Sequence, residues 1–284
     1  MENFKTNLTP GITPPPANAT EDGFDILLRL GLFAVVTVLV RVAVPIFFTL
    51  FPGQDPVLLA VLTSFVAGGV ANLMASRWFA SGRLADFGLG WTAHSIRQLW
   101  LGVGVGGAAV ACIVLGAAAS GLAVLEGGPW MSAGSLLKLL AILLLGVIGE
   151  ELIFHGDAFQ YLTRQWGALL PILLFGALFG LAHLLNNAGI TALGTLNTAM
   201  WGCLMGYAYW RTAALWLPIG LHFGWNLALV VFGTGLSGIT MGTTGLHLRW
   251  LAGEFWSGGE YGPEGGVLTT VMAGVVFLVL RRVR

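Results

Sequence analysis

Long apolar runs alternate with short polar segments along most of the chain. A helix that crosses a hydrocarbon core about 30 Å thick needs about 20 mostly apolar residues. Runs close to this length occur at about 26–51, 57–76, 99–123, 136–158, 168–186, 189–210, 213–233 and 266–281. This pattern predicts an all-α fold, a polytopic bundle of about eight transmembrane helices.

The polar segments predict the rest of the organisation. Residues 1–22 are polar, contain three consecutive prolines and lack the features of a secretory signal. We predict a disordered tail at 1–22 and a single transmembrane domain over 23–284. The stretch 77–98 contains three arginines and is too polar to span, so it is expected to lie at the membrane interface.

Charged residues are scarce for a chain of 284 residues. Only 9% are charged and 56% are hydrophobic, whereas soluble domains carry about 25% charged residues. The 13 basic and 13 acidic residues cancel, so no basic face for nucleic acid is indicated. The composition excludes an ordinary soluble enzyme and a disordered chain, and it favours an integral membrane protein.

The positions of the basic residues predict the orientation in the membrane. Basic residues concentrate in cytoplasmic loops. If both termini are cytoplasmic, Lys138 and Arg249 alone fall outside, while Arg29 and Arg41 lie in or beside the first helix. The cytoplasmic set is then Lys5, Arg77, Arg83, Arg97, Arg164, Arg211, Arg281, Arg282 and Arg284. We therefore predict a multi-pass protein of the plasma (cell) membrane with both termini in the cytoplasm.

A few ionisable and polar side chains interrupt the apolar runs. They are Glu150, Glu151 and His155 in the fourth run, His183 in the fifth, and His222 and Asn226 in the seventh. Ionisable groups inside a bilayer cost about 2.5–3.5 kcal/mol each on insertion scales, and they usually serve a function. Helix rise puts Glu150, His183 and His222 at similar depths. Because the connection 159–167 is short, the fourth and fifth helices are expected to be antiparallel neighbours. We expect one shared, partly wetted cavity that opens toward the cytoplasm.

Helical spacing assigns these side chains to faces. Glu151 and His155 are four residues apart and can pair, and His222 and Asn226 share a face in the same way. Glu150 is rotated by about 100° from Glu151 and is expected to face a different neighbour.

Carboxylates and imidazoles in a dry site suit the activation of water by a general base. We predict that Glu150 and His183 activate one water molecule, and that His222 and Asn226 donate hydrogen bonds to an oxyanion. These roles suit the hydrolysis of a peptide bond within a membrane. Glu150, His183 and His222 also offer ligands for a divalent metal such as zinc, although no HExxH motif is present.

Three short motifs resemble those of a known family. The segment from Glu150 to Gly156 reads EELIFHG and resembles the EExxxR motif of the CPBP intramembrane proteases, the CAAX-protease group also called the Abi family. FGLAH at 179–183 and HFGWN at 222–226 are similar to that family's FxxxH and HxxxN motifs. The resemblance covers about residues 135–232.

The resemblance implies an eight-helix membrane endopeptidase, a family whose best-known members remove the last three residues of prenylated CAAX proteins. It implies that Glu150 activates water with His183 as its partner, and that His222 and Asn226 stabilise the oxyanion. The substrate would be a membrane-associated or lipidated protein or peptide. A zinc-dependent and a metal-free mechanism both stay open.

His155 occupies the position of the motif arginine. In the family this arginine braces the second glutamate, which corresponds to Glu151. His155 can do so when it is protonated, but an imidazole is shorter and loses its charge near neutral pH. We expect weaker, pH-dependent or absent activity, and we expect the substitution His155→Arg to retain or raise it.

Two other functions fit parts of the pattern. A proton-coupled transporter also buries carboxylates and histidines, but inverted repeats with broken helices are not visible in the sequence. A non-catalytic immunity or scaffold protein of the same fold would be consistent with the departure at His155. Asn197, in the sixth helix, is a supporting residue that is expected to join helices rather than to act in catalysis. The glycine-rich run 102–107 is expected to be a helix-packing face.

Overall fold

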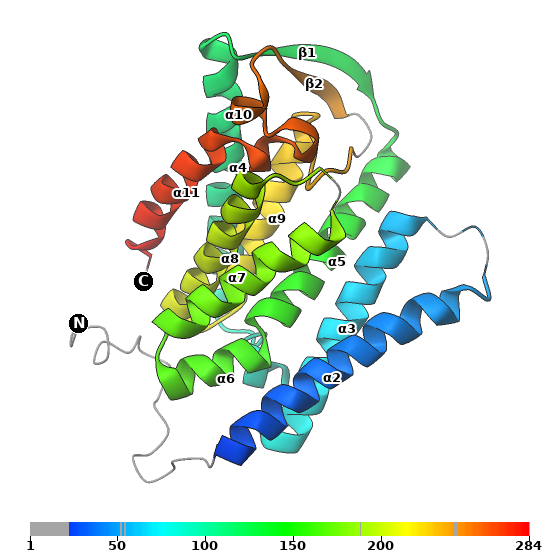
Figure 1. Ribbon diagram of the computed structural model, residues 1–284, viewed down its shortest axis with the longest axis vertical. Coiled ribbons are helices and arrows are strands. Elements are labelled where there is room, and N and C mark those ends of the chain that lie inside the picture. Colours follow the sequence, from blue (N-terminus) through cyan, green and yellow to red (C-terminus); the bar gives the residue numbers. More distant parts are fainter. Residues whose placement is uncertain (1–22, 52, 54, 188, 241–243, 284) are drawn as a thin grey trace.

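The computed structural model describes residues 23–51, 53, 55–187, 189–240 and 244–283, so the predicted tail at 1–22 lies outside the described residues. A helix forms in each of the eight apolar runs (Figure 1). These helices are α2 (Gly23–Phe48), α3 (Pro56–Phe79), α4 (Ser95–Ala119), α5 (Ala133–His155), α7 (Leu169–Asn186), α8 (Ala192–Thr212), α9 (Trp216–Val231) and α11 (Val267–Leu280). Helices α2, α3 and α4 are long and apolar enough to cross a membrane, and α7, α9 and α11 are shorter apolar helices.

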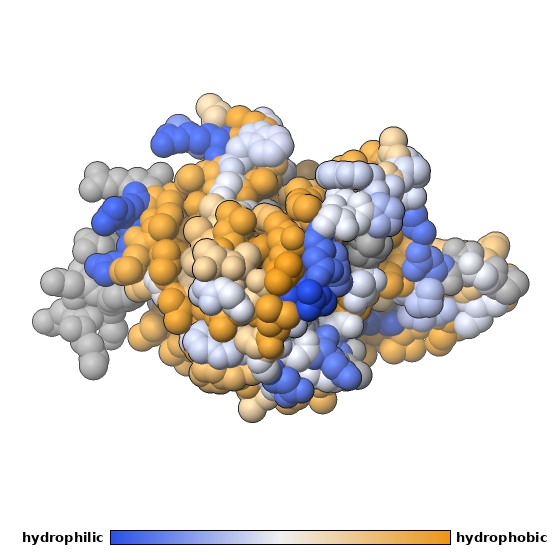
Figure 2. Space-filling model, turned by 90° about the horizontal axis from the view of Figure 1, so that it is seen from above, coloured by the Kyte–Doolittle hydropathy of each residue, from blue (hydrophilic) through white to orange (hydrophobic). Residues whose placement is uncertain are grey.

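Large apolar side chains are exposed around the outside of the bundle. On α2, Leu27 is 71% exposed, Val38 58% and Ile46 62%. Figure 2 shows such side chains over much of the face seen from above. In water these surfaces would be costly, because exposed apolar area is unfavourable by about 25 cal/mol per Å². With the apolar helices, this surface identifies a polytopic helical membrane protein.

The structure also contains elements that the sequence pattern does not predict. The connection at 159–167 lies largely within a separate helix, α6 (Asp157–Trp166), and the polar stretch 77–98 contains the 3₁₀ turn η1 (Leu84–Phe87). An antiparallel pair joins β1 (Ala123–Trp130) to β2 (Thr244–Trp250). The expectation of an all-α fold is wrong in this respect, since the protein is mostly helical with one small sheet. Three short helical segments precede α11: α10 (Glu254–Ser257), η2 (Gly259–Tyr261) and η3 (Pro263–Gly265).

Glycine lets α4 and α9 approach backbone to backbone. A Cβ atom added at Gly102 would lie 2.4 Å from the carbonyl oxygen of Leu217, and one at Gly106 would lie 2.1 Å from that of Leu221. Both separations are too short for a side chain, so only glycine permits this contact. The run 102–107 is therefore a packing face, as its position inside an apolar helix predicts.

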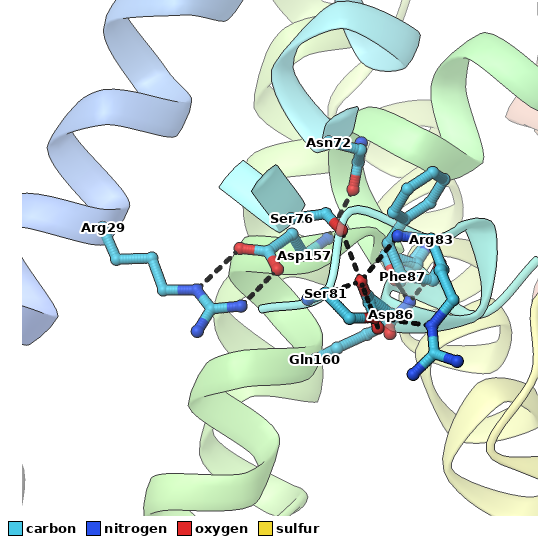
Figure 3. A network of polar contacts seen from close by, with 10 residues as sticks. Arg29, Asn72, Ser76, Ser81, Arg83, Asp86, Phe87, Asp157 and Gln160 are labelled. Carbon is cyan, nitrogen blue, oxygen red and sulfur yellow. Dashed lines mark hydrogen bonds and ion pairs between the residues drawn. The ribbon is translucent and has the colours of Figure 1, made fainter. Parts of the chain in front are cut away.

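A buried polar network holds the break between α5 and α6 (Figure 3). Arg29 of α2 donates from Nε to the Asp157 carboxylate at 2.9 Å, and both side chains are buried. Asn72 of α3 donates to the Leu152 carbonyl at 2.8 Å and accepts from the Asp157 backbone N–H at 2.6 Å. A Cβ atom at Gly156 would lie 2.3 Å from the Asn72 amide oxygen, so the chain turns here because glycine leaves room.

A second part of the same view anchors the polar stretch between α3 and α4. The Asp86 carboxylate accepts from Ser76 Oγ at 2.5 Å, from Ser81 Oγ at 2.8 Å and from the Arg83 backbone N–H at 2.9 Å (Figure 3). Burial by itself raises the pKa of Asp86, but these hydrogen bonds outweigh it and lower the pKa from 3.8 to about 2. The carboxylate therefore stays ionised near neutral pH and keeps the stretch tied to the end of α3.

Candidate active site

Glu151 lies at the centre of a buried polar cluster that joins α5 to α9. Its side chain is 0% exposed. One carboxylate oxygen lies 2.8 Å from His155 Nδ1, one turn further along α5, and the other lies 2.8 Å from His222 Nδ1 on α9. The predicted pairing of Glu151 with His155 is confirmed, whereas the contact with His222 has no signal in the sequence.

His155 contacts acceptors on two helices. Its Nε2 lies 3.0 Å from the carbonyl oxygen of Gly202 on α8. A carbonyl oxygen can only accept, so Nε2 carries a proton, and Nδ1 faces the Glu151 carboxylate. Both ring nitrogens of His155 therefore face acceptor oxygens, one on the Glu151 carboxylate and one on the Gly202 carbonyl.

Glu150 faces away from this cluster, into a cavity. Its side chain is 33% exposed, and one of its oxygens lies 3.7 Å from His222 Nε2. The cavity has a volume of about 640 Å³ and is also lined by His183, His222 and Asn226. The predictions that Glu150 and Glu151 face different neighbours, and that the polar groups of three helices share one cavity, are both confirmed.

His183 uses one ring nitrogen within its own helix and lines the cavity. Its Nδ1 lies 2.9 Å from the carbonyl oxygen of Phe179, one turn earlier on α7, so Nδ1 is the donor. In the neutral ring, Nε2 is then an acceptor. The Phe179 ring lies beside both histidines, with centroid separations of 4.5 Å to His183 and 6.0 Å to His222.

Asn197 joins helices, as predicted for it. The side chain is completely buried on α8. Its Nδ2 donates to the carbonyl oxygens of Glu264 at 2.8 Å and Gly266 at 2.9 Å, and its Oδ1 accepts from Thr270 Oγ1 at 2.6 Å. These bonds use both hydrogens of the amide nitrogen, and together with the bond to Oδ1 they tie α8 to the start of α11.

Sequence reasoning misses Glu264, which reaches the cavity from the segment before α11. Its Oε1 accepts from Trp225 Nε1 at 3.0 Å, and its Oε2 accepts from the Ser237 backbone N–H at 2.6 Å. These bonds hold the segment after α9 over the cavity. No local pattern marks Glu264, because its partners are 27 and 39 residues away along the chain.

The cavity extends from Glu150 toward the end of the bundle that carries β1 and β2. Its lining there includes Pro56 at the start of α3, Asn187 after α7 and Ile239 after α9. Helix α2 begins and α11 ends at the opposite end (Figure 1). The expectations of a cytoplasmic opening and of cytoplasmic termini therefore cannot both hold.

The proposed metal ligands do not converge. Among the described residues, no group of three or more His, Cys, Asp or Glu side chains is arranged to hold a metal ion. Glu150, His183 and His222 line one cavity, and the Nδ1 atoms of both histidines bond to protein acceptors, which is an arrangement that metal-ligating imidazoles also adopt. As folded, these three side chains are not grouped closely enough to coordinate one zinc ion.

Comparison with known protein families gives one finding. The model for a family described as Rce1-like, Type II CAAX prenyl endopeptidase Rce1-like, matches residues 129–228. The match runs from the end of β1 into α9, and it includes Glu150, Glu151, His155, His183, His222 and Asn226. A comparison with curated proteins finds no match.

Proposed function

We propose that the protein is a CAAX-type intramembrane protease that hydrolyses a peptide bond of a membrane-associated or lipidated substrate, because residues 129–228 match the model of the Rce1-like CAAX prenyl endopeptidase family. One observation supports this most strongly. Two adjacent glutamates have opposite surroundings, because Glu151 is enclosed between two imidazoles while Glu150 faces a cavity with His183, His222 and Asn226.

In the proposed mechanism, Glu150 is the general base. It takes a proton from a water molecule that His183 Nε2 helps to position, and the water oxygen bonds to the peptide carbonyl carbon. The resulting tetrahedral oxyanion accepts hydrogen bonds from His222 Nε2–H and the Asn226 amide. The C–N bond then breaks, and Glu150 returns the proton to the leaving amine.

Glu151 positions His222 for its part in this mechanism. Because the carboxylate accepts from Nδ1, it stabilises a doubly protonated ring whose Nε2–H points toward Glu150 and the cavity. His155 supplies the second imidazole neighbour of the same carboxylate. We propose that protein groups alone carry the reaction, since the side chains do not form a metal site within the described residues.

Proteolysis by the purified protein tests the proposal. The protein would be reconstituted in liposomes with prenylated and unprenylated peptides, with and without a metal chelator, and the products identified by mass spectrometry. We expect internal cleavage near the peptide's C-terminus that persists in the chelator. If no membrane peptide is cleaved, the proteolytic function is contradicted; if the chelator stops cleavage and zinc restores it, the metal-free mechanism is contradicted.

We further propose that the chain is a single transmembrane domain whose eight apolar helices all span the cell membrane, with both termini cytoplasmic. The end of the bundle where α2 begins and α11 ends carries the arginines of the helix termini, Arg77, Arg164, Arg211 and Arg281. Glu126 and Glu254 lie at the opposite end, on β1 and α10. The positive-inside rule favours this orientation, which makes the cavity open on the outer face.

Cysteine labelling distinguishes the two orientations. In a background in which Cys112 and Cys203 are replaced by alanine, Ile239→Cys marks the cavity end and Leu84→Cys marks the other end; both native side chains are exposed. A membrane-impermeant maleimide is expected to label Ile239→Cys in intact cells and Leu84→Cys only after permeabilisation. The reverse pattern would show that the cavity opens to the cytoplasm.

A further inference from the structure

An arginine lies in the wall of the cavity with no ion-pair or hydrogen-bond partner among the described residues. Arg41 of α2 lines the same cavity as Glu150 of α5. It is exposed and makes no ion pair or hydrogen bond to any other described residue, whereas Arg29 of the same helix is paired with Asp157. A charged group at a membrane-embedded position is costly, so an unpaired one points to an external anion.

Arg41 and Glu150 lie at about the same depth on different walls. Arg41 lies seven residues before the end of α2, and Thr63 lies seven residues after the start of α3. Because these antiparallel helices lie side by side (Figure 1), Arg41 is roughly level with Thr63. The next residue, Ser64, packs against Gly149, where an added Cβ would lie 2.7 Å from the Ser64 carbonyl carbon.

The chemistry between the two walls indicates what binds there. Small and apolar residues line this part of the cavity, including Ala60, Val61, Gly146 and Ile153. Apolar side chains of a peptide suit such a lining, and an arginine in apolar surroundings suits a carboxylate, which it can bind with two parallel hydrogen bonds. Arg41 is also the only lysine or arginine among the described residues that line the cavity.

We propose that Arg41 binds the free C-terminal carboxylate of the peptide substrate while Glu150 acts at a peptide bond a few residues upstream. This rests on the proposed proteolytic function. It makes Arg41 a specificity-determining residue that favours substrates with a free C-terminus. The alternative anion is a lipid phosphate, which the long arginine side chain would reach by extending toward the membrane surface.

Two peptides that differ only at the C-terminus test this proposal. One ends in a free acid and the other in a neutral amide, and kcat/KM is measured for each in liposomes of neutral lipid. The wild-type protein is expected to prefer the acid by about 10-fold or more, the effect of hydrogen bonds to a charged group. Arg41→Gln is expected to reduce this acid-to-amide ratio to about one, and Arg41→Lys to give an intermediate ratio.

The control variant and the possible outcomes distinguish a failure of the carboxylate role of Arg41 from a failure of the proteolytic function. Arg97→Gln makes the same chemical change at an exposed site outside the cavity and is expected to keep the wild-type ratio. If the wild-type protein cleaves neither peptide, the proteolytic function fails. If it cleaves both with a ratio near one, or if Arg41→Gln leaves the ratio unchanged, the carboxylate role is overturned. An effect of Arg41→Gln that appears only with anionic lipids would also overturn it, in favour of a lipid phosphate.

Discussion

Replacing Glu150 by glutamine is expected to lower the rate of peptide cleavage by about 100- to 10,000-fold, the range that a general base contributes. Glutamine has the size and shape of glutamate but cannot take a proton from water. The fold should persist, because the Glu150 side chain faces the cavity and its nearest charged group, His222 Nε2, is 3.7 Å away. Single-turnover cleavage and thermal unfolding in detergent measure the two effects separately.

The control for this substitution is Glu254→Gln, which makes the same change at an exposed residue of α10. It is expected to cleave at the wild-type rate. A Glu150→Gln variant that folds normally and also cleaves at the wild-type rate would rule out Glu150 as the base.

Replacing Glu151 by glutamine is expected to affect both stability and cleavage. Removing one member of a buried ion pair costs about 3–5 kcal/mol, because the remaining charge is left without a counter-charge. Here Glu151 faces two imidazoles, so His155 and His222 both lose their anionic partner. We expect a lower midpoint of thermal unfolding and, at temperatures where the variant stays folded, cleavage slowed by about 100-fold. Unchanged stability and unchanged cleavage would contradict the positioning role of Glu151.

The substitution His155→Arg is the matched test of the same cluster. A guanidinium can reach both the Glu151 carboxylate and the Gly202 carbonyl, and it keeps its charge at all accessible pH values. We expect cleavage to be retained or raised, although fitting the larger side chain into a packed interior costs about 1–3 kcal/mol of stability. His155→Gln, which is similar in size but uncharged, is expected to be slower. If a folded His155→Arg variant loses cleavage entirely, His155 does not act as the brace.

Local sequence patterns were sufficient to predict the structural class of this protein and some contacts within its helices. The length of an apolar run relative to the bilayer, and the scarcity of charge, do not depend on tertiary contacts, so they predict a helical membrane protein directly. The same holds for faces within one helix: the spacing of Glu151 and His155 predicts their contact, because helix geometry is local. The small sheet could not be predicted in this way, because β1 and β2 pair across more than 100 residues of chain.

The chain alone therefore determined that this is a multi-pass helical membrane protein with carboxylates and imidazoles inside it, at spacings that resemble a protease family. Only the tertiary structure showed what surrounds each of the two adjacent glutamates. Glu151 is bound by His222, 71 residues away, and Glu150 faces the cavity. It also decided that Arg41 and Glu264 line that cavity and which end of the bundle the cavity approaches. Those features depend on which helices pack together, and a helix's own periodicity carries no information about its partner.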